Sequence, residues 1–593
     1  MMQPHVYEHG AQRMDDGRVR FRLWAPGVER VTVHVGGKVL AMQRQDHGWH
    51  EVRHECPAGT PYYFEVEGHE HLPDPASRLQ AGDVDGASLV VDHDSYRWVH
   101  QGWRGRPWQE TVLYELHVGL LGGFEGVRKK LPELAELGFT AIELMPIADF
   151  PGKRNWGYDG VLPYAPDAAY GSPNDLKALI DEAHGLGLMV FLDVVYNHFG
   201  PVGNFLGAYA PSFFRDDVKT PWGAAIDFRQ PAVRSFFSEN ALYWLKEYRF
   251  DGLRFDAVHA IVGKEEWLGE LSVWLRERLP AREVHLVLEN DDNTASLLRH
   301  GYDAQWNDDA HHVIHHLLTG ETRGYYAAYS ERATDKLARA LAQGFIYQGE
   351  PSPAHGGRER GEPSYMLPTT SFVFFLQNHD QVGNRALGER LTALCRERPA
   401  ALEAAVTLQL LSPFIPLVFM GEESGSNTPF LYFTSFEDPA FAAAVREGRR
   451  LEFPDFHGHE EDIPDPNSLQ SWESSLPRSP GGALAKEWRE RYRQLLALRS
   501  QHVVPFLKGT QCDSVLVLGE GCVVACWVLG DGSRLSLYSN LSAEPVSVAS
   551  GLRDPRETIF HESAPGAAAA LLAGNIPAYC TLAGLQTVDV QQE

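Results

Sequence analysis

The stretch SPNDLKALIDEAHGLGLMVFLDVVYNH, residues 172–198, encodes an amphipathic helix followed directly by an apolar strand. Ser172 can cap the helix, Pro173 suits its first turn, and Asp175 completes a capping box. One apolar stripe follows the helical spacing i, i+3, i+4, i+7: Leu176, Leu179, Ile180 and Ala183. Glycines at 185 and 187 end the helix, and the strand begins at Met189. A helix that leads straight into a buried strand is typical of a parallel α/β sheet.

The same alternation of strands and helices runs along most of the chain. Eight strand-like runs lie at residues 112–118, 140–146, 189–195, 252–258, 284–289, 304–307, 372–377 and 415–420. Eight such units predict a (β/α)8 TIM barrel. Two connections are too long for ordinary βα loops, 199–230 after the third strand and 320–368 after the sixth. Both follow the carboxyl ends of strands, which form the catalytic face of such a barrel.

Segments rich in β structure flank the predicted barrel, so the predicted fold class is multidomain α/β. Residues 1–95 contain short strands broken by Pro and Gly, which predict an N-terminal β-sandwich. Residues 96–110 are expected to form a linker. The barrel is expected over residues 111–502, closed by a helix at 484–499. Residues 503–593 predict a C-terminal antiparallel β domain.

Composition and charge narrow the class of protein. With 593 residues, the chain is too long for one hydrophobic core. The formal net charge of −26 repels phosphate backbones and anionic lipid heads, so neither nucleic acid nor membrane is expected as a partner. The 6 cysteines are scattered without CxxC spacing, which fits isolated reduced thiols in the cytosol, although Cys522 and Cys526 could be neighbours across a strand. The polar N-terminus lacks the apolar core of a signal peptide, so a cytoplasmic location is expected.

The fourth predicted strand carries a candidate catalytic pair. In GLRFDAVH, residues 252–259, Arg254 and Asp256 lie two positions apart and therefore point the same way. Charges inside a barrel are costly unless they are paired, so the two could form a purely structural ion pair. Alternatively, the fixed guanidinium keeps Asp256 ionised, as a nucleophile requires.

The fifth predicted strand, VHLVLE, ends in Glu289 and so places a carboxyl group at the rim of the barrel. Asp291 and Asp292 follow directly. Such neighbours would raise the pKa of Glu289 by like-charge repulsion, which suits a general acid. The alternative is that Glu289 merely begins a polar loop.

Polar residues of the third and seventh strands complete a candidate site. Asp193 lies inside an apolar run, where it must find a donor, and Arg254 on the adjacent strand is the natural candidate. His379 and Asp380 follow the seventh strand, either as a structural hydrogen-bonded pair or as part of the site. Together these groups gather at one rim. Glycoside hydrolysis requires two carboxyl groups there, one to protonate the leaving oxygen and one to stabilise or trap the oxocarbenium-like centre.

Four motifs resemble the signature regions of the α-amylase superfamily, glycoside hydrolase family 13, in the right order. They are DVVYNH (193–198), GLRFDAVH (252–259), the strand that ends in Glu289, and FLQNHD (375–380). The resemblance implies a retaining mechanism with Asp256 as nucleophile and Glu289 as general acid/base. It implies that Asp380 binds the 2- and 3-hydroxyls of the reacting sugar and stabilises the transition state.

The same resemblance implies a set of substrate-binding residues around these carboxylates: Arg254, His198, His379, Asp193 and Tyr158 of NWGYDG. Tyr158 would stack beneath the reacting sugar. Asn197 and His198 lie where some relatives bind calcium, but no cage of oxygen ligands accompanies them, so neither metal nor cofactor is expected.

Further stretches resemble one family within the superfamily, the maltooligosyltrehalose trehalohydrolases. They include ELMPIADFPGKRNWGYDGV (143–161), TPWGAAIDF (220–228), QWNDDAHH (305–312), GFIYQGEPSPAHGGRERGEPS (344–364) and MGEESGSNTPFLYF (420–433). This resemblance implies hydrolysis of the α-1,4 bond next to the trehalose end of maltooligosyltrehalose, with release of trehalose and a maltooligosaccharide. It implies related α-glucans as ligands, a place in trehalose biosynthesis, and a maltooligosyltrehalose synthase as pathway partner without physical contact.

Three residues are candidates for recognising trehalose. Trp222, in the first long connection, could contact the disaccharide or merely anchor its loop. Glu422 and Glu423 could form hydrogen bonds with trehalose hydroxyls. One stretch departs from the family pattern, because VGLLGGFEG after the first strand lacks the usual Thr-rich form. No proposed catalytic group lies there.

Two other functions stay open. A glycogen-branching or debranching enzyme of the same superfamily would share the three carboxylates and a carbohydrate-binding, E-set-like N-terminal sandwich. It would form or cleave α-1,6 bonds. The second alternative is a non-catalytic, amylase-like glucan-binding protein. Such a protein would lack one or more of Asp256, Glu289 and Asp380, which are all present here.

Overall fold

A closed barrel of eight parallel strands forms the centre of the computed structural model, which describes residues 5–221, 223–453, 463–549 and 551–587. The strands follow each other around the barrel in chain order. They are β10 (Leu113–Leu116), β11 (Ala141–Leu144), β14 (Met189–Val194), β17 (Gly252–Phe255), β18 (His285–Leu288), β19 (Ala304–Trp306), β22 (Phe372–Phe375) and β23 (Ile415–Phe419). Each lies within one of the predicted runs, so the predicted (β/α)8 barrel is confirmed.

Side chains from alternate strand positions fill the barrel interior. Seven of the eight strands supply one buried apolar cluster: Leu113, Ala141, Met189, Phe191, Val287, Ala304, Trp306, Val373, Phe375, Ile415 and Leu417. Strand β17 instead contributes Arg254, which pairs in register with Asp193 on one side and Val287 on the other. Its neighbours Leu253 and Phe255 belong to the outer core. The alternation predicted for this strand is therefore confirmed.

The segment 96–110, expected to be a linker, packs against the barrel. Trp103 and Trp108 both contact the interior cluster. The Trp103 indole donates to Asp251 Oδ1 at 2.7 Å, immediately before β17. The Trp108 indole donates to the Thr370 carbonyl at 2.8 Å, shortly before β22. Because both partners precede strands, this segment covers the amino-terminal end of the barrel, opposite the strand ends that carry the candidate site.

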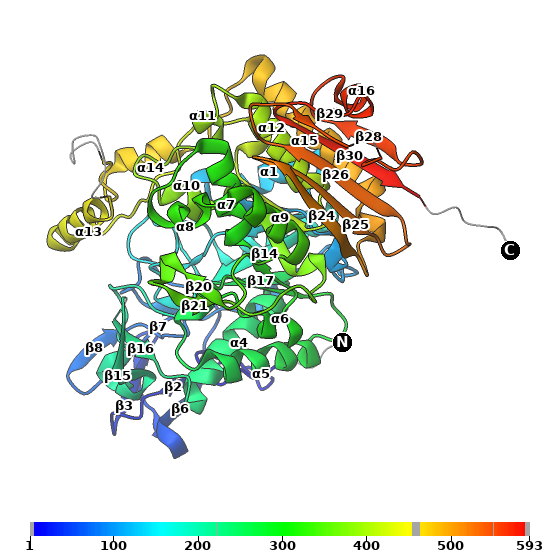
Figure 1. Ribbon diagram of the computed structural model, residues 1–593. Helices are drawn as coiled ribbons and strands as arrows, with labels where there is room; N and C mark the ends of the chain where they lie inside the picture. The colour runs from blue at the N-terminus through cyan, green and yellow to red at the C-terminus, as the bar shows by residue number, and fades with distance from the viewer. Residues whose placement is uncertain (1–4, 222, 454–462, 550, 588–593) are drawn as a thin grey trace.

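Helices surround the strands (Figure 1). The main ones are α1 (Gly123–Leu137), α2 (Pro173–Gly185), α4 (Pro231–Glu247), α5 (Lys264–Arg278), α6 (Ala295–Arg299), α7 (Asp308–Thr319), α12 (Pro399–Leu411) and α15 (Gly482–His502). The predicted capping box of α2 is present, since Ser172 Oγ accepts from Asp175 N and Asp175 Oδ2 accepts from Ser172 N. Among the described residues, no helix has the length and apolar character needed to cross a membrane.

Both long connections contain regular structure. The first forms a short helix, α3 (Leu206–Tyr209), and a hairpin of β15 (Phe214–Thr220) and β16 (Gly223–Ile226). The second forms α8 (Ala327–Ser330), α9 (Ala333–Gln343) and a hairpin of β20 (Glu350–Ser352) and β21 (Arg358–Arg360). Both are therefore folded insertions at the carboxyl ends of strands.

Antiparallel sheets flank the barrel on opposite sides, blue and red in Figure 1. One N-terminal sheet contains β1 (Gln12–Arg13), β2 (Val19–Trp24), β6 (Trp49–His54) and β5 (Gln43–Arg44). The other contains β4 (Lys38–Ala41), β3 (Val31–Val35), β7 (Pro61–Val66), β8 (His69–Leu72) and β9 (Ser88–Leu89). The C-terminal sheet is β24 (Gln511–Gly519), β25 (Cys522–Val528), β26 (Arg534–Asn540), β30 (Cys580–Gln586) and β28 (Thr558–Glu562). Cys522 and Cys526 lie along the single strand β25, and all six cysteines are free thiols.

The predicted closing helix at 484–499 is α15, and Arg499 joins it to the barrel. This arginine is fully buried (0% exposed), and burial lowers its pKa to about 9. Its guanidinium donates to the carbonyl oxygens of Leu410, Ser412 and Phe414 at 2.5–3.0 Å. These carbonyls lie at the end of α12 and just before β23, where helical C=O groups lack partners within the helix.

Replacing Arg499 with Met should destabilise the protein by about 2–4 kcal/mol, because three buried carbonyls lose their donor. Urea denaturation followed by circular dichroism measures this loss. Arg493→Met is the matched control, since Arg493 is exposed on the same helix and forms an ion pair with Glu490 one turn away. Equal stability of the two variants would contradict the role assigned to Arg499.

Candidate active site

A buried guanidinium organises the strand ends. Arg254, on β17, is fully buried, and its Nη1 donates to Asp193 Oδ2 and to Asp256 Oδ1, both at 2.7 Å. The guanidinium also lies 4.3 Å above the ring of Trp306. The predicted pairing of Asp193 with Arg254 is thus confirmed. The Asp256 carboxylate receives a charge-assisted hydrogen bond on one oxygen and remains partly accessible, with 13% of its side chain exposed.

Glu289 lies beside this pair at the end of β18. Its Oε2 accepts a hydrogen bond from the Ala257 amide at 2.6 Å and lies 4.0 Å from Arg254 Nη2. Ala257 follows Asp256 directly and has a φ of 41°, rare for a residue other than glycine. This backbone turn aims an amide of the Asp256 segment at Glu289. The carboxyl groups of Asp256 and Glu289 therefore both lie beside the Arg254 guanidinium, and the backbone turn at Ala257 connects them.

Burial is the main reason why the pKa of Glu289 is raised well above its ordinary value. The positive charge of Arg254 opposes this shift, and the negative charges of Asp256, Asp308 and Asp380 add to it. The sequence predicted a raised pKa, but from Asp291 and Asp292. That cause was wrong, because Asp291 pairs with Arg360 and His355, and Asp292 pairs with Lys264.

His379 lies between two other groups of the site. Its Nδ1 contacts Glu115 Oε1 at 2.5 Å, and its Nε2 lies 2.8 Å from the Tyr158 hydroxyl and 3.4 Å from Asp380 Oδ2. Burial alone would lower the pKa of His379, but the charges of Asp380 and Glu115 outweigh it and raise the pKa to about 9. The imidazole is therefore a cation at neutral pH, with an N–H directed to each side.

Tyr158 connects this histidine to the guanidinium. Its hydroxyl donates to Asp193 Oδ2 at 2.6 Å, and its ring stacks on His379 with centroids 5.2 Å apart. His198 Nε2 contacts the Tyr158 carbonyl oxygen at 2.9 Å, and burial lowers the pKa of this histidine. Eight of the nine predicted site residues thus belong to one connected group around Arg254. Whether Tyr158 stacks beneath a sugar stays a prediction.

Three further residues were candidates for recognising trehalose. Trp222 lies outside the described residues. Glu422 and Glu423 are buried, and their oxygens accept from the amides of Phe419 and Gly421. Glu423 also accepts from Lys130 at 3.2 Å. These internal contacts do not fit the expected hydrogen bonds to trehalose. Within the described ranges, no group of three or more His, Cys, Asp or Glu residues is arranged to hold a metal ion.

Sequence reasoning missed three acidic residues that shape the site. Glu115 on β10 holds His379, and Glu143 on β11 lies fully buried in the neighbouring strand. Asp308, at the start of α7, accepts from Gln381 at 3.0 Å. Burial first, and then the charge of Asp380, raise the pKa of Asp308 to about 7. A single acidic residue within an apolar strand was the signal that identified Asp193, and it could have identified Glu115 and Glu143.

Known proteins share this fold and much of this sequence. Residues 77–217 match the family described as alpha amylase, catalytic domain, and residues 512–578 match a domain of unknown function, DUF3459. The malto-oligosyltrehalose trehalohydrolase of Deinococcus radiodurans is 40% identical over 565 residues, covering 91% of each chain. A crystal structure of a putative alpha amylase from Salmonella typhimurium is 41% identical, with a TM-score of 0.92 over 98% of this chain and 100% of that one. The 1,4-alpha-glucan branching enzyme of Vibrio cholerae is 34% identical over 299 residues, which is 43% of this chain.

The buried state of Glu143 leads to a prediction about stability. Burial first, and then the charges of Glu115 and Asp193, raise the pKa of Glu143 well above its ordinary value of 4.5. The folded protein therefore keeps a proton that the unfolded chain loses as pH rises past 4.5. Because the folded state binds more protons, this group makes folding less favourable as pH rises.

Glu143→Gln removes this titration while keeping the shape of the side chain. The variant should gain stability relative to the natural protein as pH rises from about 5 to 8. Urea midpoints of both proteins across this range measure the difference. A difference that stays constant with pH would show that Glu143 is ionised in the folded state.

Proposed function

The chain belongs to the malto-oligosyltrehalose trehalohydrolase family of the α-amylase superfamily, and from this we propose that it hydrolyses maltooligosyltrehalose. The bond cleaved is the α-1,4-glucosidic bond next to the trehalose end, and the products are trehalose and a maltooligosaccharide. One observation supports this proposal above all, namely 40% identity to a relative of that name across 91% of both chains. The carboxyl groups gathered around Arg254 supply the chemistry that such a hydrolysis requires.

In the proposed first step, Asp256 attacks the anomeric carbon while Glu289 protonates the departing O4 of trehalose. The raised pKa of Glu289 suits this acid role, because burial makes the carboxyl group hold its proton to a higher pH than an ordinary glutamate does. The hydrogen bond from Arg254 suits a carboxylate that must stay anionic until it attacks. The maltooligosyl group is then linked covalently to Asp256.

In the second step, Glu289 acts as a base. It takes a proton from water, which attacks the anomeric carbon and releases Asp256 with net retention of configuration. Asp380 is proposed to bind the 2- and 3-hydroxyls of the reacting sugar and so stabilise the transition state. The cationic His379 lies 3.4 Å from Asp380 and fixes its position. Tyr158, Asp193 and His198 complete this sugar-binding subsite.

Specificity for the capped substrate requires a leaving-group subsite that fits the bent 1,1-linked disaccharide. Trp222 remains the proposed contact in this subsite. We place the reaction in trehalose biosynthesis, with a maltooligosyltrehalose synthase supplying the substrate without physical contact. The free cysteines support a cytoplasmic location for this reaction.

The branching-enzyme alternative has less support. The match to the branching enzyme covers 43% of this chain, whereas the trehalohydrolase match covers 91%. Trehalohydrolases and branching enzymes differ in the loops around a common barrel. A match that covers most of the chain, rather than less than half of it, therefore favours the trehalohydrolase.

Maltotriosyltrehalose and maltopentaose form a matched pair of substrates that tests this proposal. We expect rapid release of trehalose from the first and slow cleavage of the second, because the leaving-group subsite selects the 1,1-linked disaccharide. Chromatography of the products measures both rates. Equal or faster cleavage of maltopentaose would overturn the assignment and leave a general α-glucan hydrolase.

Asp256→Asn and Glu289→Gln test the proposed roles. Glu289→Gln should lower kcat on maltotriosyltrehalose by about 10²–10⁴-fold, because protonation of the leaving oxygen is lost. Asp256→Asn should lower it at least as much, because no covalent intermediate can form. Circular dichroism controls for folding. Near-normal turnover by either folded variant would remove the mechanism.

A further inference from the structure

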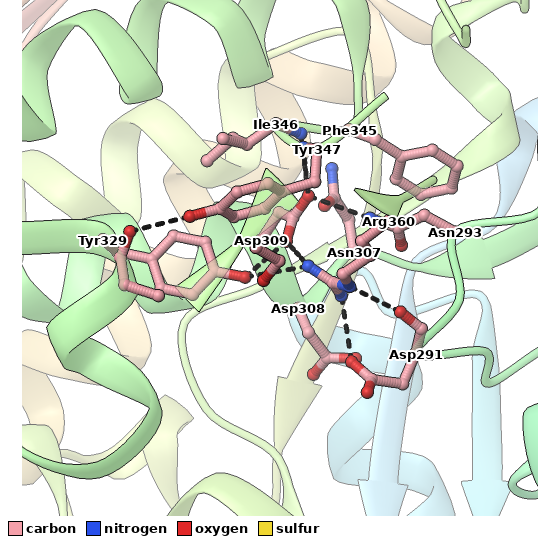
Figure 2. A network of polar contacts seen from close by, with 12 residues as sticks. Asp291, Asn293, Asn307, Asp308, Asp309, Tyr329, Phe345, Ile346, Tyr347 and Arg360 are labelled. Atoms are coloured by element: carbon pink, nitrogen blue, oxygen red, sulfur yellow. Dashed lines mark hydrogen bonds and ion pairs between the residues drawn. The ribbon is translucent and has the colours of Figure 1, made fainter. Parts of the chain in front are cut away.

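Arg360 joins the second inserted segment to the loop that follows Glu289 (Figure 2). It lies on β21, and only 3% of its side chain is exposed. Its Nη1 donates to Asp309 Oδ1 at 2.6 Å. Its Nε donates to the Asp291 carbonyl oxygen at 2.6 Å, and its Nη2 donates to Asp291 Oδ1 at 3.0 Å. One side chain thus binds both the backbone and the carboxylate of Asp291.

Asp309 anchors the other side of this contact. Its carboxylate is fully buried and accepts from the Tyr329 hydroxyl at 2.6 Å and from the Ile346 amide at 2.7 Å. It also accepts from Asn293 Nδ2 at 3.0 Å. A buried carboxylate needs a cation and several donors, and Asp309, on α7, obtains them from the inserted segment and the Glu289 loop.

Residues 290–293 form the loop directly after Glu289, and the inserted segment holds both of its ends. Arg360 binds Asp291, and the Glu362 amide donates to the Asn293 carbonyl at 3.1 Å. Asn293 has a φ of 51°, a conformation that costs energy and persists where surrounding contacts enforce it. These contacts hold the loop directly after Glu289, in addition to the backbone hydrogen bonds that join Glu289 itself to Phe255 and Val258.

We propose that Arg360 is a positioning residue for the general acid, acting through Asp291 and Asp309 to hold Glu289 at the leaving oxygen. This inference rests on the acid role proposed for Glu289. Arg254 lies within β17, and Glu289 follows β18, where its amide donates to the Phe255 carbonyl and its own carbonyl accepts from the Val258 amide. The loop that follows Glu289 is bound in addition by the inserted segment. A displacement of about 1 Å in a reacting group can cost about 100-fold in rate.

The choice of leaving group separates this role from a merely structural one. With maltotriosyltrehalose, the departing oxygen needs a proton from Glu289. With α-maltotriosyl fluoride, Asp256 attacks the anomeric carbon, the C–F bond breaks, and fluoride leaves with the electron pair without needing that proton. The kcat/KM values report the first chemical step, so a defect in acid catalysis should affect the first substrate far more than the second.

Arg360→Gln should lower kcat/KM on maltotriosyltrehalose by about 100-fold and have much less effect on the fluoride. Glu289→Gln is the reference and should show the same selective loss. Arg339→Gln is the matched control, because Arg339 pairs with Glu350 inside the same inserted segment and contacts no part of the Glu289 loop in the described hydrogen bonds and ion pairs. This control should keep normal kcat/KM on both substrates.

The outcomes separate the two proposals. If Glu289→Gln lowers kcat/KM equally on both substrates, the proposed acid role fails. Suppose that Glu289→Gln shows the selective loss. The positioning role is then overturned if Arg360→Gln lowers kcat/KM equally on both substrates, or lowers it on neither. Because Arg360→Gln leaves Asp309 buried without its cation, the variant can unfold. The double variant Arg360→Gln, Asp309→Asn removes that charge, and it should show the same selective loss in a folded protein.

Discussion

The buried guanidinium of Arg254 is the interaction on which the rest of the site depends. A charge at 0% exposure inside a barrel is tolerated only with close partners, and Asp193, Asp256 and the ring of Trp306 provide them. Asp193 can reach it because β14 and β17 are neighbours in register. One structural requirement therefore links three features: the barrel closes, the charge of Arg254 is neutralised, and the candidate nucleophile is held in place.

The carboxyl groups of the site lie in different electrostatic environments. Positive charge is concentrated at Arg254 and at His379, whose pKa rises to about 9. Asp256 lies in direct contact with the first cation and Asp380 near the second. Glu289 Oε2 lies 4.0 Å from Arg254 Nη2, and burial raises the pKa of this carboxyl group well above its ordinary value. The proposed nucleophile and the proposed acid thus lie in different electrostatic surroundings, as double displacement requires.

Sequence patterns predicted the features that depend on neighbouring strands or on the regular spacing of apolar residues. The eight strands were recognisable as short apolar runs, and the contact of Asp193 with Arg254 followed from adjacent strands and the need for a donor. Features set by distant segments were not predictable. The charges near Glu289 come from Asp308 and Asp380 rather than from the residues that follow it, and the packing of segment 96–110 on the barrel depends on tertiary contacts of two tryptophans.

The two proposed catalytic residues differ in how the fold holds them. Asp256 follows β17 directly, and the Arg254 ion pair fixes it to strands common to any such barrel. Glu289 precedes a loop whose described contacts include β21 and α7 as well as Gln305 on β19. An insertion at this position can therefore change the placement of the acid without disturbing the nucleophile. The proposed acid serves the leaving group and the proposed nucleophile serves the other side of the bond, so the second inserted segment is expected to affect the departure of trehalose rather than the attack of Asp256.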